Sequence, residues 1–350
     1  MFKATKLTTR AVVTVMSAMA LSIPALLPAA DSGSPYKVQQ TWTIGGDGGW
    51  DYLTVDSAAH LLYIARNTRI QIVDLKTGKL VGEITGFKGT HGVALDTAGK
   101  TGYISDGGSN SVAVFDRATR KVTATIPTGK NPDGILFEPK TERIFTFNGG
   151  SKDATVIDTH TNKVVATIAL PGRPEFPQAD GKGIVFANIE DVSKIVRIDA
   201  ASAKVTASWP IAPGEEPSGM AIDIAHDRLF SVCGNKKMTV VDAKSGKVVA
   251  TPAIGNGPDA AGFDAAHSVA FSSNGEGNLT ILSQKSADEY ETLQTLITKP
   301  GARTMAVDHA TGKVYLATAA LGPRPAATPE NPRPRPAILP NSFMVLVVGR

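Results

Sequence analysis

The sequence predicts an all-β fold, a seven-bladed β-propeller with four antiparallel strands in each blade. Three observations support this prediction. One motif returns seven times at intervals of 40 to 44 residues. Each copy consists of short apolar strands separated by turns, and the strand missing at the end of the last copy is found at the start of the first. A repeat of this length with four short strands is typical of a propeller blade.

Each blade is expected to begin with an apolar inner strand that ends at an acidic residue. These residues, here called the anchoring acids, are Asp56, Asp96, Glu138, Asp180, Asp223, Asp264 and Asp308. A turn and a second apolar strand follow, as at residues 62–65 and 102–105. A third strand ends at another aspartate in five copies, and a fourth reads Lys-Val-Val-Ala-Thr-Ile or a variant of it. No single blade of this kind can bury both of its faces, so the blades must pack against one another.

The last blade is predicted to be closed by the N-terminal strand. Its third strand spans residues 343–348, and the sequence then ends at Arg350. Residues 37–44 match the fourth strand that begins at Lys121. We therefore expect residues 37–44 to form the outer strand of the last blade and to cover an edge that would otherwise be open to pairing with another chain.

The first thirty residues are typical of a signal peptide, whereas residues 31–350 are expected to form the single propeller domain. Three basic residues precede the apolar run 11–27, and Ala29-Ala30 offers a cleavage site. Pro24 and the shortness of the run argue against an uncleaved membrane anchor. This segment predicts export to the periplasm, with no transmembrane segment in the mature chain.

Charge and cysteine content exclude several classes of function. The formal net charge of +4 falls to +1 when the three basic residues of the leader are removed. A uniform electrostatic attraction to nucleic acid is therefore not expected. Cys233 is the only cysteine, which excludes an internal disulfide and the two-cysteine motif for covalent haem attachment.

The second strands carry a resemblance to a known family. Residues 63–67, 103–106 and 145–148 resemble the Tyr-Val-Thr-Asn pattern of the YVTN repeat, and the run Asp242–Thr251 is similar to the turn and fourth strand of that repeat. Over residues 37–349 the chain looks like a YncE-like periplasmic seven-bladed propeller. Members of that family are linked to DNA binding, to envelope roles and to structural subunits beside redox enzymes. The resemblance transfers no functional residue to this chain.

The loops that enter the inner strands contain the candidate site. The residues five positions before the anchoring acids, here called the mouth residues, are Asp51, His91, Asp133, Glu175, Ser218, Asp259 and Arg303. All seven are polar and four are acidic, and we expect them to approach the mouth of a central channel. At the position before the mouth residue most repeats have proline, whereas the first has Trp50. At the position after it most repeats have glycine or alanine, whereas the first has Tyr52 and the fourth has Phe176.

Two interpretations of the mouth residues remain open. In the first, they bind a metal ion or an amine, with Asp133, Glu175 and His91 as possible ligands of a divalent cation. Calcium would require six to eight oxygens, whereas a histidine nitrogen favours a transition metal. Trp50, Tyr52 or Phe176 could then face an ammonium group. In the second interpretation, the acids bond to backbone turns and Arg303 neutralises Asp259 and Asp51.

A proline-rich insertion interrupts the last blade. Residues 321–341 contain repeated prolines, which favour an extended backbone, and three arginines, Arg324, Arg333 and Arg335. The insertion falls on the same face as the mouth residues. It could be a lid over the channel, a docking strip for a protein partner or a surface loop.

These features predict a binding or scaffolding protein that engages a small molecule or a protein partner on the channel face. The alternative is a metal-dependent enzyme, a lactonase-like hydrolase or a lyase, and the third possibility is a DNA-binding propeller. The sequence contains no recognisable catalytic motif. His60, His226, His267 and His309 follow anchoring acids in turns on the opposite face, where solvated histidines are common.

Overall fold

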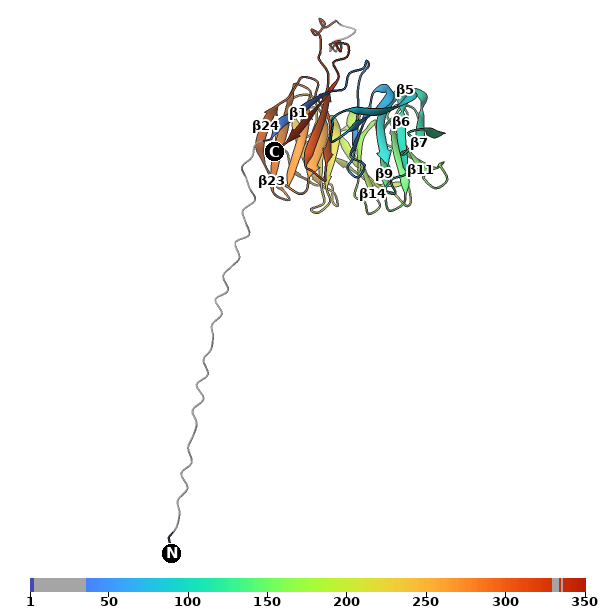
Figure 1. Ribbon diagram of the computed structural model, residues 1–350. Helices are drawn as coiled ribbons and strands as arrows, with labels where there is room; N and C mark the ends of the chain where they lie inside the picture. The colour runs from blue at the N-terminus through green and yellow to red at the C-terminus, as the bar shows by residue number, and fades with distance from the viewer. Residues whose placement is uncertain (3–35, 329–333, 335) are drawn as a thin grey trace. The chain divides into compact units, whose positions relative to one another are not determined.

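The computed structural model describes residues 1–2, 36–328, 334 and 336–350 (Figure 1). Contacts divide the chain into two compact units, Met1–Ser34 and Pro35–Arg350. Nearly all of the predicted signal peptide lies outside the described residues. The described part of the second unit is built from strands, with two short 3-10 helices, η1 (Gly107–Ser109) and η2 (Glu190–Val192). Within the described residues, no helix is long and apolar enough to span a membrane.

The first two repeats share one antiparallel sheet of seven strands, where the sequence predicted two separate sheets. The strands are β2 (Leu53–Asp56), β3 (Leu61–Ala65), β4 (Asn67–Asp74), β5 (Leu80–Leu95), β6 (Thr101–Asp106), β7 (Ser111–Asp116) and β8 (Val122–Pro127). The start of β5 pairs with β4 as an outer strand, and its end pairs with β6 as the inner strand of the next repeat. The link is continuous because β5 runs unbroken through the segment between the two repeats, where Gly86 alone has a positive φ, of 98°.

Four further repeats each form a separate four-stranded antiparallel sheet. The third contains β9 (Pro132–Glu138), β10 (Arg143–Asn148), β11 (Asp153–Asp158) and β12 (Lys163–Ala169). The fourth contains β13 (Pro174–Ala179), β14 (Ile184–Ile189), β15 (Lys194–Asp199) and β16 (Lys204–Pro210). The fifth contains β17 (Pro217–Asp223), β18 (Arg228–Cys233), β19 (Lys237–Asp242) and β20 (Val248–Ala250). The sixth contains β21 (Pro258–Asp264), β22 (Val269–Asn274), β23 (Asn278–Ser286) and β24 (Glu289–Ile297).

The seventh repeat confirms the predicted role of the N-terminal strand. Its strands are β25 (Thr304–Asp308), β26 (Lys313–Thr318), β27 (Met344–Gly349) and, from the other end of the chain, β1 (Lys37–Thr43). β1 pairs antiparallel with β27 over its whole length, from Lys37 opposite Gly349 to Thr43 opposite Met344. Trp42 is buried in this strand and packs beside Tyr315, with 5.5 Å between the ring centroids. The pairing joins the two ends of the described domain.

The hydrophobic core of the described domain lies between neighbouring repeats. Buried Val, Ile, Leu, Phe and Ala side chains form seven clusters, and each cluster combines side chains of two neighbouring repeats. One of them joins Leu62 and Ile64 of the first repeat to Phe343 and Val345 of the seventh. The inner strands contact one another in the order β2, β5, β9, β13, β17, β21 and β25, and β25 contacts β2. The packing that the sequence required of its repeats is therefore present on both sides of each sheet.

Candidate functional site

The mouth residues are placed by irregularities at the start of the inner strands. In repeats two to six, the first residue of the inner-strand pairing is separated from the next pair by a register shift, and the mouth residue lies inside that shift. In the third repeat, for example, Pro132 pairs with Asn148 and Ile135 pairs with Thr146, while Asp133 lies between. A bulge of this kind re-aims the side chain that it contains. The repeated bulge therefore turns one residue of each of these repeats toward the same face.

The first mouth residue, Asp51, is held by a loop that one buried arginine organises. Arg66 is fully buried, and its guanidinium donates hydrogen bonds to the backbone carbonyls of residues 45–49 at 3.0–3.2 Å. It also donates to Gln71 Oε1 at 2.5 Å and lies over the ring of Phe343, 3.6 Å from the centroid. Burial lowers the pKa of Arg66 to about 10, so the group remains charged at neutral pH. No pattern in the sequence pointed to this residue.

His91 and two aspartates form the centre of the site. His91 Nδ1 lies 2.6 Å from Asp51 Oδ2 and 3.5 Å from Asp133 Oδ1. One potential ligand atom from each of the three residues lies within 4.8 Å of the others. The three side chains are only partly exposed, at 29% for Asp51, 26% for His91 and 20% for Asp133. The structure thus brings together three mouth residues that the sequence separates by about 40 positions each.

Glu175 adds a fourth polar group, together with a partner that was not expected from the sequence. Its Oε1 lies 3.3 Å from Arg173 Nη2, and the same guanidinium contacts Glu190. Arg173 lies outside the columns of mouth residues and aromatic residues, seven positions before its anchoring acid. Glycine stands at this position in four of the other repeats. The contrast between those glycines and Arg173 is the sequence signal that could have identified Arg173.

The pKa values of all four groups are raised, but the causes differ between the acids and the histidine. Burial and the nearby Asp133 raise the pKa of Glu175 to about 8. Burial and Asp51 raise that of Asp133 to about 6, and burial also raises the pKa of Asp51. For His91, burial acts against the charge, but the hydrogen bond to Asp51 and the neighbouring carboxylates outweigh it and raise the pKa to about 9. At neutral pH the site therefore contains a protonated histidine between carboxylates, with a proton on Glu175.

An aromatic pair lies among the same residues. Tyr52 and Phe176 meet edge to face, with their ring centroids 5.0 Å apart and their planes at 90°. They come from the first and fourth repeats, and small residues occupy the equivalent position in most of the others. A side chain at Gly92 would approach the Tyr52 ring at 3.2 Å. Burial, followed by Asp133 and Glu175, raises the pKa of the Tyr52 hydroxyl well above 10.

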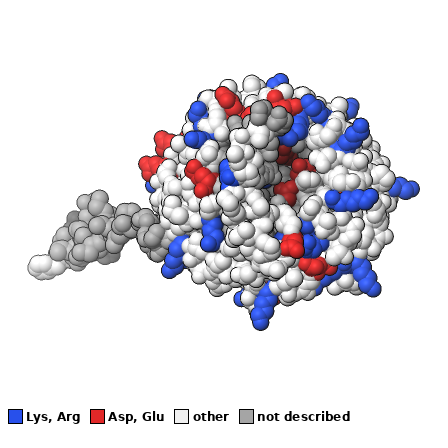
Figure 2. All heavy atoms as spheres, turned by 90° about the horizontal axis from the view of Figure 1, so that it is seen from above, with Lys and Arg blue, Asp and Glu red and all other residues white. Residues whose placement is uncertain are grey.

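Figure 2 shows acidic side chains around the central hollow of the face seen from above.

The remaining mouth residues have partners of their own. Ser218 Oγ donates to the backbone oxygen of Pro258 at 3.2 Å. Arg303 Nη1 lies 3.5 Å from Asp259 Oδ2, whereas the short contact of Asp51 is with His91. The expectation that Arg303 would neutralise both aspartates is met by an ion pair with Asp259, whereas Asp51 feels the Arg303 charge, which lowers its pKa, without forming the short contact. The reason is that His91 takes the position next to Asp51.

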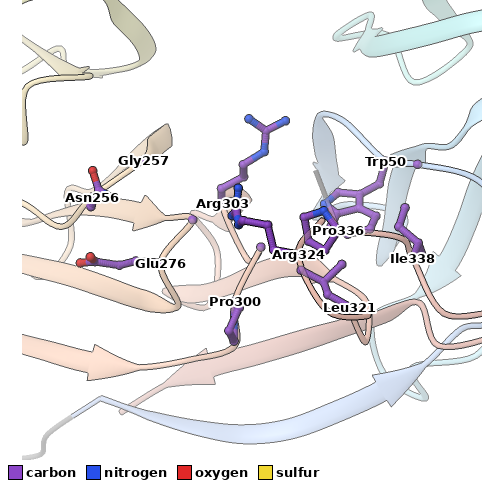
Figure 3. Close-up of a pocket in the computed structure, with 13 residues that line it drawn as sticks. Trp50, Asn256, Gly257, Glu276, Pro300, Arg303, Leu321, Arg324, Pro336 and Ile338 are labelled. Carbon is purple, nitrogen blue, oxygen red and sulfur yellow. The ribbon is translucent and has the colours of Figure 1, made fainter. Parts of the chain in front are cut away.

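The insertion lies beside this half of the face. A cavity of about 750 Å³ is lined by Trp50, Arg303, Arg324 and parts of the insertion (Figure 3). Trp50 packs against Phe343 at 5.5 Å between centroids, and it lines this cavity rather than contacting the Tyr52–Phe176 pair. Arg324 Nη1 donates to the backbone oxygen of Pro334 at 3.1 Å. Arg333 and Arg335, the other two candidates for a lid or a docking strip, lie outside the described residues.

Two histidines of the opposite face are bonded to anchoring acids. His226 Nδ1 lies 2.6 Å from Asp223 Oδ2, and His267 Nδ1 lies 2.7 Å from Asp264 Oδ2. Their side chains are 52% and 42% exposed, as expected for turn residues. These histidines fasten turns, so they do not contribute to the mouth.

Comparison with known proteins identifies the fold. No family model matches the sequence, and no curated protein matches it. Among solved structures, the chain is similar to hydrazine synthase of Kuenenia stuttgartiensis, with a TM-score of 0.69, 18% identity and coverage of 78% of this chain and 94% of that one. It is also similar to U3-55K, with a TM-score of 0.73, 9% identity and coverage of 89% and 98%. It is similar as well to the WD40 repeats of RRP9, with a TM-score of 0.74, 9% identity and coverage of 90% of this chain and 97% of that one. At these identities the likeness shows a β-propeller fold and leaves the function open.

Proposed function

We propose that this chain is an exported seven-bladed propeller of the YncE-like type that acts as a binding protein, with its ligand held at the mouth residues. The circular order of inner-strand contacts and the seven clusters between repeats support seven blades. The YVTN-like second strands support the family, and the leader-like residues 1–30 support export to the periplasm. N-terminal sequencing of the protein purified from fractionated cells tests whether residues 1–30 are removed.

One observation carries the choice of ligand: Asp51, His91 and Asp133 offer two oxygens and a nitrogen within 4.8 Å of one another. Glu175 adds a carboxyl that the same surroundings keep protonated at neutral pH. A divalent cation would remove the repulsion that raises the pKa values of these carboxyls. The mixed oxygen and nitrogen donors favour zinc or manganese over calcium, which prefers oxygens alone.

The proton on His91 determines how such a cation would enter. Nδ1 faces both aspartates, so the imidazolium already supplies one positive charge to the cluster. A metal ion bound at Nδ1 would have to displace that proton, and a metal ion bound to Glu175 would displace another. Cation binding should therefore release protons and strengthen as the pH rises from about 6 to about 9, the range of the shifted pKa values.

Native mass spectrometry and calorimetry test the proposal directly. The mature protein, prepared without chelator, is titrated with Zn²⁺ and with Mn²⁺ beside an Asp133→Ala/Glu175→Ala variant. The control replaces two exposed acids of the outer strand β24, Glu289→Ala/Glu291→Ala. We expect one ion per chain for the wild type and the control, and at least tenfold weaker binding for the mouth variant. Equal binding by all three proteins, or no stoichiometric binding by any, would reject a cation site at the mouth.

A second function, metal-dependent hydrolysis or lyase chemistry, is supported by the pKa values of the same groups. Catalytic acids and bases work best when their pKa lies near the working pH, and Asp133, Glu175 and His91 have values of about 6, 8 and 9. A bound cation would polarise a carbonyl, and Glu175 would hold or accept a proton. A panel of aliphatic lactones assayed with Mn²⁺ tests this alternative. Turnover that survives in the Asp133→Ala/Glu175→Ala variant would assign the activity to a contaminant and leave the binding role.

The neighbours provide a more general argument for binding. WD40 propellers such as RRP9 present loops on a rigid ring, and this chain has the same kind of ring with an added insertion. A protein partner on the same face is consistent with the proposal, and an affinity capture with and without residues 324–336 would detect it.

A further inference from the structure

A second candidate site shares Arg303 with the mouth residues and lies between the insertion, the last two repeats and the loop that enters the first. The cavity has a volume of about 750 Å³, within the range that accommodates a small organic molecule. Its wall combines the loops that enter three inner strands, the loop between β22 and β23, and the two ends of the insertion. The side chains that carry the argument are Trp50, Glu276, Arg303, Leu321, Arg324 and Ile338. Four further lining positions are glycine, so the wall carries few side chains there and the space stays open.

The described parts of the insertion hold their side of the cavity through backbone hydrogen bonds. Leu321 and Ile338 form an antiparallel bridge. Gly322 N donates to Ala337 O at 2.8 Å, and Leu339 N donates to Ala320 O at 2.9 Å. The two ends of the insertion therefore form a short ladder, and Arg324, two residues beyond it, donates a hydrogen bond from Nη1 to the backbone oxygen of Pro334 at 3.1 Å.

Apolar and charged groups occupy different parts of this wall (Figure 3). Trp50, Leu321, Pro336 and Ile338 lie on one side, and Asn256 and Glu276 lie on the other. Arg303 stands between them, and Arg324 extends from the insertion toward it. Arg303 Nη1 lies 3.5 Å from Asp259 Oδ2, which is long for an ion pair. The side chain of Arg303 is 38% exposed. Two guanidinium groups that face one space repel each other, and an anion placed between them would relieve that repulsion.

Glu276 limits which anion can enter. Asn278 Nδ2 donates to Glu276 Oε1 at 2.6 Å, and hydrogen bonds from the Asn256 backbone and from Asn278 hold the pKa of Glu276 below its ordinary value. This fixed negative charge at the polar side would oppose a second negative group. A ligand with one anionic end and an apolar body satisfies the arginines, Trp50 and Glu276 together.

We propose that this cavity binds an organic monocarboxylate, with the carboxylate between Arg303 and Arg324 and the apolar body against Trp50, Leu321 and Ile338. The site is separate from the Asp51–His91–Asp133 cluster and requires no metal ion. Arginine is suited to the role because its planar fork binds a carboxylate through two parallel hydrogen bonds. The side chain of Trp50 offers a broad flat surface for an apolar or aromatic body.

The test uses 4-phenylbutyrate as the probe and 4-phenylbutanol, its uncharged counterpart, as the comparison. Binding to the mature protein is measured by calorimetry and by quenching of tryptophan fluorescence, which a Trp50→Phe variant assigns. We expect 4-phenylbutyrate to bind at least tenfold more tightly than the alcohol. Arg324→Gln and Arg303→Gln should each weaken binding of the acid by roughly tenfold or more, without affecting the alcohol. Arg197→Gln is the matched control, because Arg197 lies on β15 in another sheet and donates a hydrogen bond to Thr206 of β16.

A substitution that fills the cavity distinguishes loss of the site from loss of the fold. A Cβ at Gly49 meets no atom within 4 Å, and the φ of Gly49 lies outside the left-handed region, so Gly49→Leu should be tolerated while its side chain takes up space at the cavity wall. We expect it to abolish binding of 4-phenylbutyrate and leave the melting temperature within a few degrees. No saturable binding to the wild type, equal affinity for acid and alcohol, or unchanged affinity in both Arg variants would each overturn the proposal.

Discussion

The two faces of the propeller use carboxylates in opposite ways. On one face five of the seven anchoring acids are buried, and all seven accept backbone N–H hydrogen bonds from the turn that follows. Asp308 is 3% exposed and accepts hydrogen bonds from Ser57 Oγ at 2.5 Å, Ala310 N at 3.1 Å and Thr311 Oγ1 at 2.7 Å. Burial by itself would raise its pKa, but these bonds hold the pKa of Asp308 below its ordinary value. On the other face, the pKa values of Asp51, Asp133 and Glu175 are all raised.

The difference lies in what surrounds each carboxylate. The anchoring acids end a strand, so the backbone N–H groups of the next turn point at them. The mouth residues stand where the inner strands begin, inside a bulge in repeats two to six, and their neighbours around the ring are other mouth residues. Burial with donors stabilises the charged form, and burial among other acids destabilises it. The first arrangement serves the fold, and the second leaves a site that a cation or a proton must complete.

The largest expected change in stability comes from removing an anchoring acid that accepts several hydrogen bonds. Asp308→Ala removes the acceptor of three hydrogen bonds and leaves Ser57 Oγ and two groups of the turn without their partner. We expect the free energy of unfolding to fall by about 2–4 kcal/mol. Urea denaturation of the variant beside Asp308→Asn, which keeps the size and one acceptor oxygen, measures the loss. A midpoint equal to that of the wild type would show that the anchoring acids are dispensable.

The raised pKa of Glu175 should make the stability of the protein depend on pH. The folded-state pKa of Glu175 is about 8, above its ordinary value of 4.5, so the unfolded chain loses this proton first as the pH rises. The free energy of unfolding of the metal-free protein should then decrease by about 1–3 kcal/mol between about pH 5 and pH 8. Glu175→Gln cannot titrate and should show a flatter curve over this window. Parallel curves for the two proteins would mean that Glu175 ionises normally.

His91 offers a smaller test with the same sign. Its folded pKa of about 9 lies above the ordinary 6.5, so the stability that its charge contributes is complete below about pH 6.5 and is lost as the pH rises through about 9. His91→Gln should cost about 1–2 kcal/mol at pH 6 and nothing above pH 9. Thermal unfolding at both pH values checks this, with the turn variant His160→Gln as the control. A cost that does not change with pH would indicate that His91 acts only by packing.

The smallest expected effect concerns the hydroxyl of Tyr52. A hydrogen bond from Tyr52 lowers the pKa of Asp133 and partly opposes the effect of burial. Tyr52→Phe keeps the edge-to-face contact with Phe176 but removes this donor, so the pKa of Asp133 should rise by a fraction of a unit with little change in stability. Carboxyl carbon NMR titration of both proteins measures the shift. A fall in that pKa would contradict the assigned hydrogen bond.

Much of the fold could be predicted from the sequence because the repeat is local. Each turn, strand and anchoring acid is determined by residues within about 40 positions, and β1 was recognised as the outer strand of the last repeat because it resembles the other outer strands. The joined sheet of the first two repeats could not be predicted, since it depends on an extended loop around Gly86. Arg66 was missed for a similar reason: its partners are backbone carbonyls, which leave no pattern in the side chains.

By itself the sequence determined the repeat, the all-β class, the strand that joins the two ends and the column of polar residues on one face. Tertiary structure alone decided which of those residues meet. Asp51, His91 and Asp133 converge because successive inner strands lie side by side, and Tyr52 reaches Phe176 although three repeats separate them along the chain. It also decided that Arg303 pairs with Asp259 and faces a cavity under the insertion. Periodicity specifies local conformation and burial, whereas side-chain contacts depend on distances across the ring that no local pattern contains.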